Sequence, residues 1–403
     1  MRNFACAGCG LLFLAFPIIV SAQNPTISAH ARELQSHSIV IDAHADTTQR
    51  LLDPRFDLAA RHADGNVDIP RMKEGGLGAI FFAIWIPGTN IGPAAVEKAL
   101  GQIAAVREAV ERHSNDMMLA RTAADVRRAF AERKIAALLG VEGGHMMNDD
   151  FSVLRAFAAL GVRYMTLTHW RNTGWADSST DKPAHNGLTD FGKQAILEMN
   201  RNAMLVDVSH ASDKTFWDAL AVSQAPIIAS HSSCRAICNA PRNMTDDMMK
   251  ALAAAGGVIQ INYHVGFLSQ KYVDATNAHP EIVKQIRDEV AQRCAPDDEN
   301  CQLMTENIIV RRMMLDGTLP QVRWTEIVDH IDHAVKVAGI DHVGLGSDYD
   351  GSDMPLGMED VTHLPQITQA LIDRGYFDAD IKKILGENTL RLMADAERVS
   401  QEM

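Results

Sequence analysis

The sequence predicts an α/β fold, a closed (β/α)8 barrel of the TIM type. Short apolar, β-branched runs recur along the chain, and helix-forming residues at helical spacing follow them. Alternating strands and helices are typical of a parallel sheet with crossover connections. Eight such units favour a closed barrel over an open, doubly wound sheet. No Gly-x-Gly-x-x-Gly follows the first run, which weakens a dinucleotide-binding version of the open sheet.

The expected strands are the apolar runs themselves. They lie at residues 39–43, 78–85, 135–141, 163–168, 203–208, 226–229, 257–262 and 342–346. Segments between them, such as 94–112 and 246–255, have helical spacing. The longest interruption, at about 265–321, separates the last two strands and is acidic. We expect it to be an elaborated loop over the barrel or an interface element.

The first residues have the pattern of a targeting segment. A positive head at Arg2 precedes an apolar run over residues 4–20 and small residues suited to cleavage. We predict a signal peptide at 1–22 and one barrel domain at 23–403. A retained membrane anchor is the alternative.

Cleavage of this segment would place the protein in the periplasm or outside the cell. Such oxidising compartments permit disulfides. Cys294 and Cys301 flank a polar loop and are the expected pair.

Composition excludes some classes of function. The chain has 403 residues, 47% of them hydrophobic and 22% charged, with a formal net charge of -13. Nucleic-acid binders are usually basic, so this balance disfavours them, and it also disfavours a cationic membrane-surface role.

Potential metal ligands stand at the C-terminal ends of the expected strands, where (β/α)8 barrels build their active sites. His44 and Asp46 close the first strand and are two residues apart, so they point to the same side. The others follow the third, fifth, sixth and eighth strands and are Glu142, His210, His231 and Asp348.

These side chains predict a metal centre. Histidine and carboxylate ligands without thiolate suit zinc, or else manganese or cobalt. Three imidazoles and three carboxylates exceed what one tetrahedral ion needs, so we expect two ions with Glu142 as a bridge. His145, three residues further on, competes with Glu142 for this role.

Three more residues at the same rim suit a hydrolase. His169 could hydrogen-bond a developing oxyanion, or it could be a structural histidine. Arg242 could hold a substrate carboxylate in a bidentate fork, or form a surface ion pair. Asp348 could bind metal, or take a proton from the attacking water and pass it to the leaving amine.

Together these segments resemble the membrane dipeptidase family, also called renal dipeptidase or peptidase family M19, over residues 39–388. The matching strings are DAHAD at 42–46, VEGG at 141–144, TLTH at 166–169, NTGWAD at 172–177, DVSH at 207–210, SHSS at 230–233, RN at 242–243 and GSDYDG at 346–351.

The resemblance implies a TIM-type barrel of the metal-dependent hydrolase superfamily with two zinc ions. His44 and Asp46 would then bind the first ion, and Glu142 would bridge both. The second ion would be bound by His210 and His231.

The resemblance also implies the reaction. The family hydrolyses dipeptides, often with a D-residue in second position, and we expect a water between the ions to be the nucleophile. His169 would contact the scissile carbonyl, Arg242 the C-terminal carboxylate, and Asp348 would handle the proton. Family members often carry Tyr where this chain has His264, so that substrate contact is in doubt.

The main rival is another binuclear amidohydrolase-type barrel, a lactonase, phosphotriesterase or β-lactam hydrolase. Enzymes of the phosphotriesterase and dihydroorotase kind typically use His-x-His on the first strand and a Lys after the fourth. Here the first motif is His44-x-Asp46, and residues 163–169 contain no Lys. Asp46 also disfavours a mononuclear deaminase, and an inactive binding protein would lack a ligand that this chain retains.

The predicted partner is a dipeptide substrate. A homodimer is left open. No nucleic acid is expected, nor a membrane span once the signal peptide has been removed.

Overall fold

The computed structural model describes residues 26–403, so the predicted signal peptide at 1–22 lies outside the described residues. Eight parallel strands close a barrel in the order β1-β2-β4-β5-β6-β7-β8-β9, with β9 pairing back to β1. The barrel strands are β1 (Val40–Ala45), β2 (Leu77–Ile84), β4 (Ile135–Glu142), β5 (Val162–Thr166), β6 (Leu205–Asp207), β7 (Ile228–Ser232), β8 (Val258–Ile261) and β9 (Val343–Leu345). The predicted (β/α)8 barrel is confirmed.

Each of the eight expected strands corresponds to one strand of the barrel. A ninth strand, β3 (Met117–Leu119), was not predicted. It is three residues long and pairs with the beginning of β4, outside the closed ring. So short a run between two helices has too few residues to show an alternating pattern.

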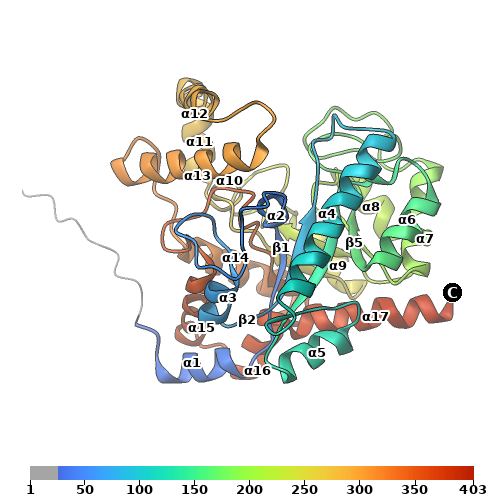
Figure 1. Cartoon of the computed structure of the whole chain (residues 1–403), viewed down its shortest axis with the longest axis horizontal. Coiled ribbons are helices and arrows are strands. Elements are labelled where there is room, and N and C mark those ends of the chain that lie inside the picture. The colour runs from blue at the N-terminus through green and yellow to red at the C-terminus, as the bar shows by residue number, and fades with distance from the viewer. Residues whose placement is uncertain (1–25) are drawn as a thin grey trace, which may run out of the picture.

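Helices surround the barrel (Figure 1). Those before β5 are α1 (Ala29–Ser36), α2 (Thr48–Leu51), α3 (Ile69–Gly75), α4 (Pro93–Arg112), α5 (Ala123–Ala131), η1 (Gly144–Met147) and α6 (Phe151–Leu160). Those from β5 to β9 are α7 (Asp190–Arg201), α8 (Asp213–Val222), α9 (Asp246–Ala254), α10 (Val265–Leu268), α11 (Gln270–Ala278), α12 (Pro280–Arg293), α13 (Glu299–Asp316), α14 (Thr325–Ala338) and η2 (Ile340–His342). The last are η3 (Val361–His363), α15 (Leu364–Asp373), α16 (Asp378–Lys382), η4 (Lys383–Glu387) and α17 (Asn388–Glu402).

Polar side chains set the starts of many of these helices. Thr122, Thr189, Ser212 and Thr245 each accept a hydrogen bond from a backbone N–H of the first helical turn. Such caps satisfy donors that the helix itself leaves unpaired. Within residues 26–403, none of the helices is both long and apolar enough to cross a bilayer.

Two large clusters make up most of the hydrophobic core. Val40 and Ile80 belong to the cluster that includes the surrounding helices. Their neighbours Ile41 and Phe81 belong to a second cluster, which also contains Leu390 of α17. The barrel interior is therefore packed, and α17 lies across one end of it (Figure 1). This leaves the other end, where the strands finish, for a site.

The long interruption between the last two barrel strands is largely helical, from α10 to α13. In Figure 1, α11, α12 and α13 lie at the top, at the opposite end from α1 and α16. A disulfide between Cys294 and Cys301 links the end of α12 to the start of α13, as predicted. The division into signal peptide and single domain stays a prediction.

Candidate metal centre and substrate cavity

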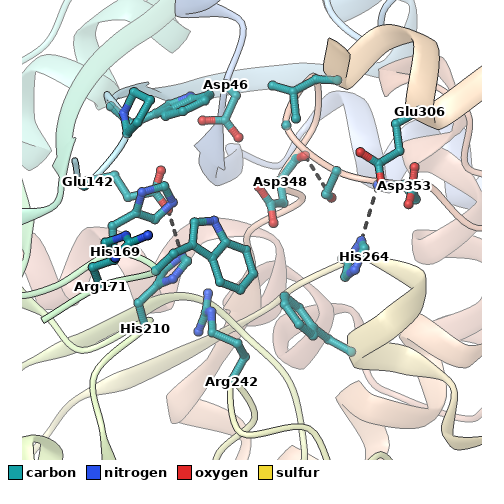
Figure 2. Close-up of a pocket in the computed structure, with 18 of the residues that line it drawn as sticks. Asp46, Glu142, His169, Arg171, His210, Arg242, His264, Glu306, Asp348 and Asp353 are labelled. Atoms are coloured by element: carbon teal, nitrogen blue, oxygen red, sulfur yellow. Dashed lines mark hydrogen bonds and ion pairs between the residues drawn. The ribbon is translucent and has the colours of Figure 1, made fainter. Parts of the chain in front are cut away.

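A cavity of about 610 Å³ opens at the C-terminal ends of the strands. Asp46, Glu142, His210, Arg242 and Asp348 line it, together with residues of α13 and of the loops after β2, β5, β8 and β9 (Figure 2). The structure thus brings to one place side chains that are up to about 300 residues apart in the sequence.

His44, Asp46 and Asp348 form one group of potential ligands. The Nε2 atom of His44 lies 3.7 Å from Oδ1 of Asp46 and 4.0 Å from Oδ1 of Asp348. His44 Nε2 and Asp46 Oδ1 are buried and have no hydrogen-bond partner within residues 26–403. Buried polar atoms are nearly always satisfied, so a cation between these atoms fits their arrangement.

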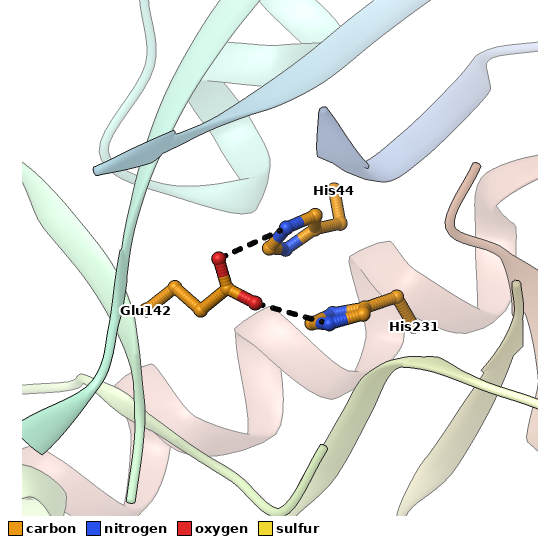
Figure 3. A group of neighbouring side chains, drawn as sticks. All are labelled: His44, Glu142 and His231. Carbon is orange, nitrogen blue, oxygen red and sulfur yellow. Dashed lines mark ion pairs between the residues drawn. The ribbon is translucent and has the colours of Figure 1, made fainter. Parts of the chain in front are cut away.

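Glu142 lies between this group and two further histidines. Its Oε2 atom is 3.6 Å from His44 Nε2. Its Oε1 atom is 2.9 Å from His210 Nε2 and 3.2 Å from His231 Nε2. Figure 3 shows the two carboxylate oxygens facing His44 and His231 separately. This is the geometry expected of a carboxylate that serves two adjacent cation positions.

The hydrogen bonds behind His231 fix which of its nitrogens carries the proton. Ser230 Oγ donates to Asp207 Oδ2 at 2.7 Å, so it accepts from His231 Nδ1 at 2.8 Å. A neutral imidazole then has a bare lone pair on Nε2. That lone pair faces Glu142 Oε1. The Nε2 atom of His231 also lies 3.0 Å from the Nε2 atom of His210. Two acceptors in direct opposition repel each other unless a cation lies between them.

His44 is oriented in a comparable way. Its Nδ1 atom lies 2.8 Å from the phenol oxygen of Tyr164, which is buried inside the barrel. A hydrogen bond to the second ring nitrogen holds the ring and is common behind metal-binding histidines. Tyr164 and the Ser230–Asp207 pair were not predicted from the sequence.

The backbone is irregular where two of the candidate ligands lie. Strand register shifts within 42–45 of β1, around His44, and within 229–232 of β7, around His231. Such irregularities redirect side chains and are frequent near active sites.

Two further rim residues have strained backbone. His210 and Asp348 have φ of 67° and 66°. This left-handed conformation costs a non-glycine residue about 1 kcal/mol or more, and such strain concentrates at functional sites.

The electrostatics of the group suit a cation. Burial works against the charge of Glu142, but His169, His44 and the other imidazoles together bring its pKa well below the usual value. Burial lowers the pKa of His210 well below normal, and it also lowers the pKa of His231. These imidazoles are therefore neutral near pH 7, as metal ligands must be.

His44 differs from them. Burial alone would lower its pKa, but Tyr164, Glu142 and Asp46 raise the pKa well above its usual value. The pocket around His44 thus favours a positive charge, whether a proton or a metal ion.

His169 and Arg242 face the same cavity. His169 Nε2 lies 3.7 Å from Glu142 Oε1. Arg242 is 4% exposed, and its Nη2 donates to the carbonyl of His231 at 3.3 Å. Its Nε and Nη1 have no hydrogen-bond partner in the described part of the chain. Burial lowers its pKa to about 10, so it stays charged near pH 7 and offers free donors to an anion.

His145 is buried but belongs to none of the ligand groups formed by residues 26–403. Of the two competitors, Glu142 is the residue that lies among the histidines. His264, three residues beyond the end of β8 and directly before α10, does line the cavity. Burial lowers its pKa to about 4, so it is neutral near pH 7.

Several cavity residues escaped the sequence analysis. They are Trp85, Trp170, Arg171, Glu306 and Asp353. Trp170 and Arg171 directly follow His169, so their position was a usable signal. Glu306 lies within the long interruption on α13, where nothing in the sequence marks which side chains face the strands.

Comparisons with known proteins identify the family of the chain. The family model for membrane dipeptidases, peptidase family M19, matches residues 28–403. A dipeptidase of Claviceps purpurea, tcpJ, is 34% identical over 357 residues, which cover 86% of this chain and 72% of that protein.

Two solved structures are similar over most of the chain. The probable dipeptidase PvdM of Pseudomonas aeruginosa has a TM-score of 0.78 and 28% identity, covering 92% of this chain and 98% of that one. A metallo peptidase of Rhodobacter sphaeroides, liganded with a phosphinate mimic of the dipeptide L-Ala-D-Ala, has a TM-score of 0.72 and 25% identity, covering 89% and 99%. The chain therefore belongs to the membrane dipeptidase family, peptidase family M19, and is a peptide hydrolase of that metallo-dipeptidase type.

Proposed function

We propose that the protein hydrolyses the peptide bond of dipeptides with the help of two zinc ions, and that it accepts L,D as well as L,L substrates. One observation carries this most directly: the bare lone pair of His231 opposite Glu142, in a site where Arg242 keeps two guanidinium donors, Nε and Nη1, unpaired. A cation would satisfy the opposed acceptors of His231 and Glu142, and a substrate carboxylate would satisfy the unpaired donors of Arg242. A liganded relative supports the L,D substrate, because it holds a mimic of L-Ala-D-Ala.

The donor set divides into two positions that share Glu142. His44 and Asp46 would hold one ion, and His210 and His231 the other. Imidazole and carboxylate donors without thiolate suit zinc. When bound, such a pair of ions lowers the pKa of a water molecule towards neutrality and polarises the carbonyl that the water attacks.

Other residues would bind and orient the substrate. The free donors of Arg242 would grip the C-terminal carboxylate, and its planar fork favours a bidentate contact. His169 stands across Glu142 and would hydrogen-bond the carbonyl oxygen as negative charge develops there.

Asp348 would transfer the proton of the attacking water to the leaving amine. Its Oδ2 is held by Asn262, and its Oδ1 faces His44. Despite burial, His231 and His44 keep its pKa below the usual value, so it is ionised and ready to accept a proton. The same carboxyl would then protonate the leaving amine.

We also propose that the protein works outside the cytoplasm, in the periplasm or secreted. The disulfide between Cys294 and Cys301 supports this, because disulfides persist in oxidising compartments. The signal peptide at 1–22 and a homodimer stay predictions.

A dipeptide library tests the function. Purified protein with zinc supplied is assayed on L,L and L,D dipeptides, and on a lactone, a β-lactam and a phosphotriester. We expect hydrolysis of dipeptides in both series. Inactivity on every dipeptide, with turnover of the lactone or the phosphotriester, would overturn the proposal in favour of the rival amidohydrolase-type function.

A further inference from the structure

Two carboxyl groups lie on the side of the cavity opposite His169 (Figure 2). Asp353 comes from the loop after β9, and Glu306 comes from α13. Asp353 is 8% exposed. Its backbone N–H donates to Nδ1 of His264 at 3.3 Å, but no residue within 26–403 donates a hydrogen bond to its carboxylate.

A buried carboxylate without a partner is costly, and a second carboxylate beside it adds to the cost. Burial and the charge of Glu306 raise the pKa of Asp353 well above its usual value. The neighbouring His264 does not supply a compensating charge, since it is neutral near pH 7 and its Nδ1 is already an acceptor. Arg287 also lines the cavity, and its charge partly offsets the burial of Glu306, yet the pKa of Glu306 stays above its usual value. Among the described residues, Arg287 forms no ion pair with either carboxylate. A bound proton relieves this cost, and so would a cationic group brought in from outside, which would restore the charge of the carboxylates.

An apolar path links this pair to the carboxylate clamp. The guanidinium carbon of Arg242 lies 5.2 Å from the ring centroid of Phe267. The ring centroids of Phe267 and His264 are 4.6 Å apart. The His264 ring in turn accepts a hydrogen bond from the backbone N–H of Asp353. Leu303, three residues before Glu306 on α13, also lines the cavity.

This order of side chains indicates which part of a dipeptide would reach the acidic pair. A carboxylate on Arg242 belongs to the C-terminal residue, whose side chain branches from the adjacent carbon. That side chain would pass along Phe267 and Leu303 towards Asp353 and Glu306. Lysine and arginine side chains combine an apolar stem with a cationic end, which matches this sequence of contacts.

We propose that Asp353 and Glu306 form a subsite for a cationic side chain on the C-terminal residue of the dipeptide. The inference rests on the proposed function and adds a substrate class to it: dipeptides that end in lysine, arginine or a similar basic residue.

The test compares kcat/KM for Ala-Lys, Ala-norleucine, Lys-Ala and Ala-Ala, with the second residue in both configurations. Norleucine keeps the apolar stem and removes the ammonium. We expect Ala-Lys to exceed Ala-norleucine by about tenfold or more, the effect of a charge-assisted contact, and Lys-Ala to show no such advantage over Ala-Ala.

Variants assign the preference to the two carboxylates. Asp353→Asn and Glu306→Gln should each reduce the Ala-Lys to Ala-norleucine ratio by about fivefold or more. Asp316→Asn is the matched control, because it makes the same charge change on exposed α13 surface outside the cavity. It should leave the ratio as in the parent protein. Glu306→Gln is decisive if Asp353→Asn fails to fold.

The outcomes separate the two proposals. Hydrolysis of Ala-Ala with an Ala-Lys to Ala-norleucine ratio near one would overturn the subsite and leave the dipeptidase function standing. So would a preference for Lys-Ala, or an undiminished ratio in Glu306→Gln. Failure to hydrolyse any of the four dipeptides would overturn the proposed function, and the subsite with it.

Discussion

The side-chain amide of Asn262 donates a hydrogen bond of 2.9 Å to Oδ2 of Asp348. Asn262 lies just beyond the end of β8, and Asp348 lies just beyond the end of β9, so the bond joins two neighbouring strand ends. It fixes a carboxylate whose backbone is already strained at a φ of 66°. The other oxygen, Oδ1, is left facing His44. Asp348 is thus held in place by one oxygen and open to the site by the other.

The first prediction concerns that open oxygen. Asp348→Asn keeps the size of the side chain but removes its ability to accept and return a proton. We expect kcat for a dipeptide to fall by about 10²- to 10⁴-fold, with the bound metal unchanged. Kinetics and metal analysis on the same preparation check this. Loss of one ion from the variant would instead make Asp348 a ligand, a role its place beside His44 and Asp46 also allows.

Arg242 gives the second prediction. Its Nε and Nη1 are free and buried, so we expect them to serve the substrate carboxylate. Arg242→Ala should lower kcat/KM for dipeptides by about 100-fold, and much less for a dipeptide amide that has no free carboxylate. Arg242→Lys is the matched variant that keeps the charge and removes the planar fork. An equal loss on both substrates would remove the clamp role.

Ser230 supplies the third prediction, through its position between His231 and Asp207. Ser230→Ala removes the acceptor for His231 Nδ1–H and leaves the metal-facing nitrogen free to take the proton. Loss of such a supporting contact typically weakens metal affinity by about 10- to 100-fold. Competition with a chelator measures it. Ser38→Ala, a buried serine that donates to the carbonyl of Leu34, is the control and should have parental affinity.

A fourth prediction lies away from the site, at His330 on α14. Its Nδ1 accepts from the N–H of Cys234, its Nε2–H donates to the carbonyl of Leu268, and burial lowers its pKa to about 4. The unfolded chain binds a proton on this residue near pH 6.5. The folded state therefore loses stability as pH falls from about 6.5 towards 4, and is unaffected above that window.

Between about pH 7.5 and pH 5, His330 should account for about 2 kcal/mol of the fall in the free energy of unfolding. In His330→Gln the free energy of unfolding should fall by about 2 kcal/mol less over this interval. His37 is exposed, so His37→Gln should show the same fall as the parent protein. Denaturant unfolding at both pH values measures the difference. A parental pH dependence in His330→Gln would contradict the account.

Much of the site follows from position in the chain. In a (β/α)8 barrel all strands end on one face, so a ligand-type residue after each strand is enough to expect a shared site. His44, Glu142, His210 and His231 were predicted in this way, and the structure places each of the three histidines within 3.6 Å of a carboxylate oxygen of Glu142.

Other features depend on packing that no local pattern encodes. Tyr164 contacts His44 because the two strands face each other across the barrel interior, 120 residues apart in sequence. The register shifts around His44 and His231 are set by pairing with neighbouring strands. Glu306 reaches the cavity only because α13 folds back over the strand ends, which helical periodicity alone does not specify.

The central claim is that Glu142 joins two cation positions in one active site. Metal analysis of the active protein, with dipeptide hydrolysis followed as metal is added back after chelation, tests it most directly. The account predicts about two ions per chain at full activity, and the loss of metal binding in Glu142→Gln. Full activity with one tightly bound ion per chain would contradict it.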